Sequence, residues 1–358
     1  MKDFKKHFPA LQGRVYLNTP ASGLLSKPVY NWRKEQEEGF LFNGNDYGAT
    51  LEALKNVRET ISSFFHASES NVALVPNFSF GLNTLLEGLP QKQKVLLLKG
   101  DYPSINWPVQ MRDFDVCFAE TTGNIEQNIE AAVTKHRPTV FVFSVVQWLS
   151  GIKIDFDFLK ELKVYHPDLL LIADGTQYLG TEKFNFEESP LDVIGTSTYK
   201  WLLSGYGNGF FLFKESVKEK IFPNTIGFNS AANFDSSPEE ITFTKHFEPG
   251  HLGLFNYGSL RKSLQFMEEL GVDIIQNKIK VLSEKAKLAF MDLGLLNDTI
   301  VNRENHSPIF NIKGDAVLFQ KLKKNNIICS QRGGGIRVGF HFYNSEEDLE
   351  ALLEILKH

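Results

Sequence analysis

Two residues of types that can do chemistry follow apolar segments of the sequence. Asp174 directly follows the apolar run 169–173, and Lys200 follows the apolar run 191–194 and the Ser-Thr-Tyr segment 197–199. A lysine amine can form a Schiff base with an aldehyde cofactor, and a carboxylate can keep a pyridine nitrogen protonated. The pair therefore predicts an enzyme that uses pyridoxal 5'-phosphate (PLP), with Lys200 and Asp174 as its catalytic residues.

Each of the two residues has a simpler interpretation when it is taken alone. An aspartate at a strand end often caps a helix or a turn, and a lysine often extends its amine to solvent along an apolar surface. Lys200 stands between Tyr199 and Trp201, which favours partial desolvation. A desolvated lysine has a lowered pKa and becomes nucleophilic, so the two residues together favour the catalytic interpretation.

The segment 77–83 has the residue types of an anion site. It reads Asn-Phe-Ser-Phe-Gly-Leu-Asn, follows the apolar run 72–75 and begins a helical pattern. A helix N-terminus presents free N–H groups and a positive dipole end to a phosphate, and Ser79 adds a hydroxyl. The signal is weak by itself, because Asn77 and Ser79 would serve equally well as ordinary helix caps.

Two further segments offer ring stacking and carboxylate binding. Tyr102 lies in the segment 101–107, after the apolar run 95–98, and can stack on a flat cofactor; the alternative is a surface loop anchored by its aromatic residues. Arg337 follows the glycines 333–335, which allow a sharp turn or a close approach. Arginine is the usual bidentate partner of a carboxylate, although a surface salt bridge is the simpler interpretation.

Alternating strands and helices are expected to position these residues. Several of the strand-like runs are continuously apolar, which is typical of strands covered on both faces. The alternation predicts an α/β fold whose large domain has a mostly parallel, seven-stranded sheet flanked by helices. The expected strands are 72–75, 95–98, 115–119, 139–144, 169–173, 192–195 and 209–213, and the expected helices are 48–65, 77–89, 124–136 and 156–165.

The pattern changes after about residue 240, which predicts a smaller α+β domain. Two long helices (258–270 and 271–293), two short strands (307–312 and 335–340) and a final helix (345–357) are expected, the last with Ser345 and Asp348 at its start. We therefore assign residues 16–240 to a large PLP-binding domain and residues 1–15 and 241–358 to a small domain. The boundary is placed in the polar stretch 229–244.

Composition sets limits on function. The 358 residues are 42% hydrophobic and 23% charged with a net charge of −5, which is ordinary for a soluble globular protein and argues against nucleic-acid binding. No apolar run approaches the length of a membrane span, and the N-terminus shows no signal-peptide pattern. The two cysteines make no disulfide framework. A cytoplasmic enzyme with a small-molecule substrate, no membrane or nucleic-acid partner and no metal site is expected.

The chain resembles the class V aminotransferases, the fold-type-I PLP enzymes that include cysteine desulfurases and isopenicillin N epimerase-like proteins. The resemblance runs from Tyr16 to the C-terminal helix. It is most specific in the segments 173–177 (ADGTQ) and 197–210 (STYKWLLSGYGNGF), and the segments 247–271 and 333–356 add weight. The resemblance implies a homodimer with shared active sites.

The resemblance also implies roles for individual residues. Lys200 would form the Schiff base and Asp174 would pair with the pyridinium nitrogen. Three residues differ from those common in the family. Tyr199 stands where desulfurases have a histidine that contacts the phosphate, and its hydroxyl could serve instead; Gln147 stands where many relatives have an asparagine, and His251 where they have a threonine. The remaining implied contacts are Gln177 and Gln147 with the cofactor oxygen, Phe78, Ser79 and Ser197 with the phosphate, Tyr102 with the ring, His251 near the partner's phosphate, and Arg337 and Asn18 with the substrate.

Several functions remain open at this point. The preferred one is transamination of an amino acid or related amine; epimerisation and elimination are alternatives on the same scaffold. A cysteine desulfurase or selenocysteine lyase would need a reactive Cys329, which we interpret as a strand-end residue because it directly follows Ile327-Ile328. A non-catalytic relative is disfavoured by the presence of Asp174, Lys200 and Arg337. A dehydrogenase is excluded, because no G-x-G-x-x-G motif begins the first strand–helix turn.

Overall fold

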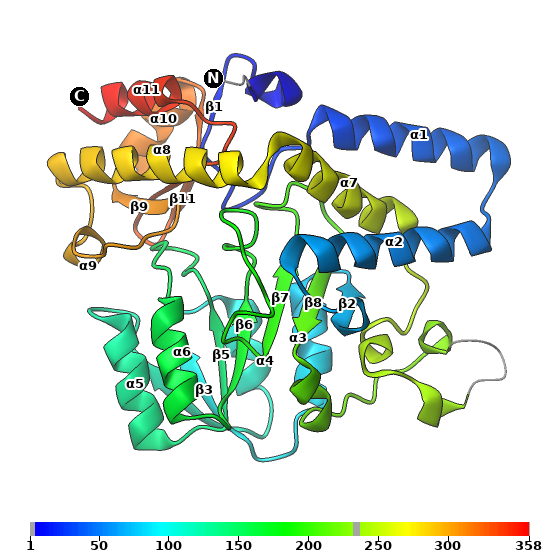
Figure 1. The fold of residues 1–358 in the computed structure, drawn as a ribbon. Helices are drawn as coiled ribbons and strands as arrows, with labels where there is room; N and C mark the ends of the chain where they lie inside the picture. Colours follow the sequence, from blue (N-terminus) through cyan, green and yellow to red (C-terminus); the bar gives the residue numbers. More distant parts are fainter. Residues whose placement is uncertain (1–3, 232–236, 358) are drawn as a thin grey trace.

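The structure, a computed structural model, describes residues 4–231 and 237–357 (Figure 1). Within these residues the central sheet has seven strands in the order β2-β8-β7-β6-β5-β3-β4. β3 to β7 run parallel, whereas β8 is antiparallel to both of its neighbours. The predicted, mostly parallel seven-stranded sheet is thus confirmed. The strands are β2 (Val72–Val75), β3 (Lys94–Leu98), β4 (Asp115–Ala119), β5 (Val140–Ser144), β6 (Leu170–Asp174), β7 (Val193–Ser197) and β8 (Gly209–Phe213).

Alternate residues of each strand supply the two apolar layers of the core. On β5, Val140 and Val142 pack with α3 and α4, whereas Phe141 and Phe143 pack in the cluster that includes α2, α5 and α6. This division follows from the two-residue period of a strand, and it explains why the interior strands are continuously apolar. The helices are α2 (Tyr47–Phe65), α3 (Phe78–Glu87), α4 (Pro103–Gln110), α5 (Ile125–His136) and α6 (Phe156–Tyr165).

The C-terminal part of the chain forms a second group of elements, with a three-stranded antiparallel sheet in the order β11-β12-β9. The N-terminal strand β1 pairs in parallel with β10, so the two ends of the chain lie together (Figure 1). The strands are β1 (Val15–Tyr16), β9 (Ile309–Lys313), β10 (Ile327–Ile328), β11 (Ser330–Arg332) and β12 (Gly335–Gly339), and the helices are α1 (Lys27–Asn43), α7 (Leu254–Leu270), α8 (Val272–Asp292), α9 (Asp298–Val301), α10 (Ala316–Lys324) and α11 (Glu346–Leu356).

Short 3₁₀ helices connect several of these elements. Asp348, at the start of α11, accepts a hydrogen bond from the Ser345 N–H at 3.1 Å, as its position in the sequence predicts. Among the described helices, none is long and apolar enough to cross a membrane. The 3₁₀ helices are Lys5–His7, Pro9–Leu11, Glu69–Asn71, Glu215–Glu219, Phe228–Ser230, Pro238–Glu240 and Phe243–Phe247.

The sequence prediction was incomplete in the second group of elements. It did not identify α1, α9, α10, β1, β10 or β11, and it also missed α4 beside the large sheet. The division into domains stays a prediction. Residues 232–236 of the boundary stretch 229–244 lie outside the described residues.

Candidate active site

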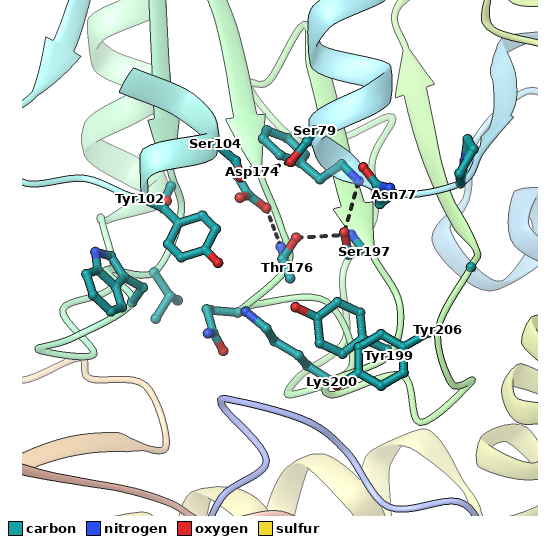
Figure 2. A pocket seen from close by; sticks show the side chains of 17 residues that line it. Asn77, Ser79, Tyr102, Ser104, Asp174, Thr176, Ser197, Tyr199, Lys200 and Tyr206 are labelled. Carbon is teal, nitrogen blue, oxygen red and sulfur yellow. Dashed lines mark hydrogen bonds between the residues drawn. The ribbon is translucent and has the colours of Figure 1, made fainter. Parts of the chain in front are cut away.

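A pocket of about 460 Å³ lies at the carboxyl ends of the parallel strands, where open α/β sheets bind their ligands. Asp174 comes from the end of β6, and Ser197 and Lys200 come from the end of β7 and the loop that follows. The starts of α3 and α4 contribute Ser79 and Tyr102. Figure 2 shows these side chains around one cavity, so the structure brings together the core of the predicted site.

Lys200 is buried, and Gly23 lies directly against its backbone. Burial lowers the pKa of Lys200 to about 8; Arg337 and Arg332 lower it further, and Asp174 opposes the shift. The Gly23 N–H donates to the Tyr199 carbonyl at 2.8 Å, and a Cβ on Gly23 would lie 2.0 Å from the Lys200 carbonyl oxygen. The close approach requires glycine there and fixes the loop that carries the amine.

Asp174 is the last residue of β6 and is also buried. Burial raises the pKa of Asp174 to about 6, while the hydrogen bonds from Thr176 and the charge of Lys200 oppose the shift. One of these bonds, from the Thr176 N–H to Oδ1, is 2.8 Å long. In the part of the chain that the structure describes, neither Asp174 nor Lys200 has an ion-pair partner. The two charged groups therefore face one pocket without neutralising each other directly.

The start of α3 forms the anion-binding end of the pocket. Asn77 caps the helix by accepting from the Phe80 N–H at 2.9 Å, and Ser197 Oγ accepts from the Phe78 N–H at 2.9 Å. Ser79 Oγ donates to Ser104 Oγ at 2.8 Å. Three hydroxyls and a helix N-terminus thus converge on one place (Figure 2), which suits a phosphate.

Aromatic rings line the pocket beside Lys200. The Lys200 Nζ atom lies 5.5 Å from the centre of the Tyr102 ring and 5.6 Å from that of Tyr199. The Tyr199 ring in turn stacks on Tyr206 with centroids 4.4 Å apart, and the Tyr102 ring meets Trp148 edge-on at 5.6 Å. Tyr102 directs its ring into the cavity (Figure 2), as a stacking residue would.

Arg337 lies outside the lining of this pocket, whereas Gln177 belongs to the lining but is already hydrogen-bonded within the chain. Arg337 on β12 is buried behind Trp148, where its Nη1 donates to the Trp148 carbonyl at 2.7 Å. Burial lowers the pKa of Arg337 to about 10, and Arg332 adds to the shift. Gln177 lines the pocket, but its amide oxygen already accepts from Trp201 Nε1 at 2.8 Å, and its amide nitrogen donates to the Pro20 carbonyl at 2.9 Å.

Besides Arg337, three further described residues of the predicted site do not line this pocket. Gln147 is buried and donates weakly to the Ser144 carbonyl at 3.4 Å. Asn18 accepts from the Ser330 hydroxyl, and His251 is exposed with its ring 5.6 Å from that of Tyr47. Their cofactor and substrate contacts stay predictions.

Sequence reasoning missed the groups that hold the site in place. Asp101, just beyond β3, is buried and accepts from Ser144 Oγ at 2.6 Å and from the Ser144 N–H at 2.8 Å; burial raises its pKa. Thr176 Oγ1 accepts from the Ser197 N–H at 3.0 Å. A signal was available for Asp101, because it follows an apolar strand as Asp174 does.

Neither cysteine belongs to the pocket lining among the described residues. Cys329 lies buried between β10 and β11, and burial raises the pKa of its thiol to about 11. Cys117 lies buried in β4 with its thiol pKa also raised by burial. The position of Cys329 agrees with a strand-end residue, as the sequence predicts.

The residues present fit PLP. The cofactor needs an amine, a carboxylate, an aromatic neighbour and an anion site, and this pocket holds Lys200, Asp174, Tyr102 and the start of α3, which would supply them. The buried carboxylate and amine, which make no ion pair with any described residue, are the observation that carries the fit. Fold and site together define a PLP-dependent enzyme.

Comparison with known proteins identifies the family. The model of the aminotransferase class-V family matches residues 15–352, and the chain belongs to this family, whose members use PLP. An uncharacterised aminotransferase, YcbU of Bacillus subtilis, is 20% identical over 99% of this chain and 96% of its own length. A probable cysteine desulfurase of Methanothermobacter thermautotrophicus is 22% identical over 99% of this chain and 97% of its own.

Solved structures show the same fold. The cysteine desulfurase of Thermococcus onnurineus, in its apo form, superposes with a TM-score of 0.85 over 100% of this chain and 98% of its own, at 17% identity. A C-DES variant with glycine covalently linked to its PLP cofactor superposes with a TM-score of 0.88 over 99% of both chains, at 18% identity. These similarities confirm the fold-type-I architecture.

Proposed function

We propose that the protein is an aminotransferase that acts on an α-amino acid. The observation that carries the proposal is the buried Lys200 amine, whose pKa is lowered to about 8, facing the buried Asp174 across one pocket. When bound, PLP supplies an electron sink for negative charge that develops on the α-carbon of the substrate. Near neutral pH a lysine with this pKa has a larger neutral fraction than an exposed one, so it can take up and return a proton.

Each residue of the site has a defined role in this proposal. Asp174 holds the proton on the pyridine nitrogen, and the Lys200 amine moves the proton at the α-carbon. Tyr102 orients the ring, and Arg337 binds the α-carboxylate through a guanidinium whose Nε has no described partner. The phosphate contacts come from Phe78, Ser79, Ser104 and Ser197 at the start of α3 and around it.

Cysteine desulfurization is the second candidate, because several relatives carry that name. The desulfurase mechanism needs a thiolate at the substrate, whereas Cys329 is buried with a raised pKa and does not line the pocket. Sulfide release from L-cysteine that disappears in Cys329→Ser would support this candidate over transamination.

We also propose that two chains assemble into a homodimer through α1 and the start of α2. Large apolar side chains are exposed there, including Phe40, Leu41, Phe42 and Tyr47, and His251 lies beside Tyr47. An exposed apolar patch of this kind is typical of an interface. Sedimentation at micromolar concentration is expected to show a dimer that Leu41→Asp dissociates; a monomeric wild-type protein would contradict the assembly.

We also propose that the chain divides into two domains at residue 240 and that the protein is cytoplasmic. Two buried free cysteines suit a reducing compartment.

The test of the proposed reaction is a spectral screen. Purified protein with PLP is expected to absorb in the visible range, and an accepted amino acid should convert this absorption to that of the amine form of the cofactor. The conversion should reverse on addition of the matching 2-keto acid. Protein that takes up no PLP, or absorption that no amino acid changes, would overturn the proposal.

A further inference from the structure

A second guanidinium, that of Arg332, lies on the same face of the small sheet as Arg337. β11 and β12 pair so that Ser330 faces Arg337 and Arg332 faces Gly335. Directly paired residues share a face of the sheet, and so do residues two apart on one strand. Arg332 therefore belongs to the face that carries Arg337, one diagonal step toward the tip of the hairpin.

The hairpin tip is held against the pocket wall. Gly333 and Gly334 have φ values of 60° and 76°, which a two-residue turn of type I′ requires. A Cβ on Gly333 would lie 3.0 Å from Leu149 Cδ2, next to the Trp148 carbonyl that Arg337 contacts. Asn311 Nδ2 donates to the Arg332 carbonyl at 3.1 Å. The turn, the contact with Leu149 and this hydrogen bond fix the position of the Arg332 backbone.

The Arg332 side chain is exposed and unpaired. It makes no ion pair and no side-chain hydrogen bond with any residue of the described ranges 4–231 and 237–357. Its charge nevertheless reaches the site, because it lowers the pKa values of both Lys200 and Arg337. The two guanidiniums thus lie on one face of the small sheet beside the pocket, and Asp174 is the one carboxylate among the charges that shift the Lys200 pKa.

We propose that Arg332 binds a second carboxylate, on the side chain of the amino acid, so that the preferred substrates are dicarboxylic amino acids. The inference rests on the proposed function, in which Arg337 takes the α-carboxylate. A substrate with one carboxylate would occupy Arg337 and leave Arg332 without a counter-charge. A substrate with two would match both cations, and a planar guanidinium is suited to bidentate carboxylate binding.

The test measures binding to the PLP-loaded protein by absorption titration. L-Aspartate and L-glutamate are compared with their neutral isosteres L-asparagine and L-glutamine, in the wild type, Arg332→Gln, Arg332→Lys and the exposed-charge control Lys324→Gln. In the wild type we expect an acid to bind about tenfold or more tightly than its amide, as for a well-placed charge pair. Arg332→Gln should abolish this preference and leave amide binding unchanged; Arg332→Lys should keep part of it, and Lys324→Gln all of it.

The outcomes separate the inference from the proposed function. If amides and acids bind equally to the wild type, or if the preference persists in Arg332→Gln, the inference is wrong while the proposed function stands. If neither these four amino acids nor L-alanine, added as a small neutral substrate, changes the absorption, both are wrong. Because Arg332 is exposed, the variants are expected to fold, which circular dichroism checks.

Discussion

The two ends of the pocket are built in different ways. At the strand ends and the start of α3, polar groups satisfy one another: Ser197 bonds Phe78 and Thr176, and Ser79 bonds Ser104. At the hairpin end, Arg337 keeps an Nε atom without a described partner, and Arg332 extends into solvent. The first end is preorganised by the protein alone, whereas the second has donors that no described residue occupies and that a ligand can use.

This difference suggests that one end of the pocket binds the cofactor and the other binds the substrate. Groups that already hold their geometry suit a cofactor that stays bound through many turnovers, because little order must be created on binding. Groups with free donors suit a substrate that enters and leaves. Substitutions at the two ends should therefore separate cofactor retention from substrate affinity.

The largest effect is expected from Lys200→Ala at the cofactor end. Loss of the amine removes both the attachment point and the proton-transfer group, so turnover should fall by at least about 10²- to 10⁴-fold, the usual contribution of a general acid–base group. Cofactor content after dialysis should fall as well. The exposed Lys183→Ala is the matched control and should behave as wild type.

Arg337→Gln at the hairpin end should have the next largest effect. Losing a buried charged partner costs about 2 kcal/mol or more, which corresponds to a roughly 30-fold weaker affinity for the amino acid. Titration of the loaded protein measures this change. Cofactor content should stay at the wild-type level. A variant that loses its cofactor would contradict the assignment of cofactor binding to one end and substrate binding to the other.

Cofactor uptake by the PLP-free protein should depend on pH, because it requires the Lys200 amine. The neutral amine is the nucleophile, and the pKa of Lys200 is lowered to about 8, so the uptake rate should rise through pH 7 to 9 with a midpoint near 8. Arg332 lowers this pKa, so Arg332→Gln should move the midpoint upward. A midpoint above pH 10 in the wild type, as for an exposed lysine, would contradict the desolvated site.

Cys329→Ser should have the smallest effect. The raised pKa of Cys329 keeps its thiol protonated at neutral pH, and the side chain does not line the pocket. Transamination and cofactor content should therefore match the wild type, as measured in the same assays. A large loss of activity would place Cys329 in the reaction and favour the desulfurase alternative.

The cofactor end was also the more predictable from sequence. Lys200, Asp174, Ser79 and Tyr102 follow apolar strands or begin helices, and the carboxyl ends of parallel strands meet at one edge. The strands of the large sheet were predicted to within two residues at each end, because they are apolar on both faces. Local pattern and topology suffice there.

The hairpin end could not be predicted in the same way. Arg337 was identified only as a residue type after three glycines, and the pairing that sets Arg332 on the same face depends on the register of β11 with β12. β1, β10 and β11 have only two or three residues, too few to show a period. Likewise, the sequence could not show that Gln147 and Asn18 lie outside the pocket lining, because the direction of a side chain depends on packing.

Locating the cofactor on the chain tests whether Lys200 is its attachment point. The loaded protein is reduced with borohydride, digested and mapped by mass spectrometry, which records the lysine that carries PLP. We expect the cofactor on the peptide that contains Lys200 and on no other lysine. An unmodified Lys200 peptide, or PLP on a different lysine, would contradict it.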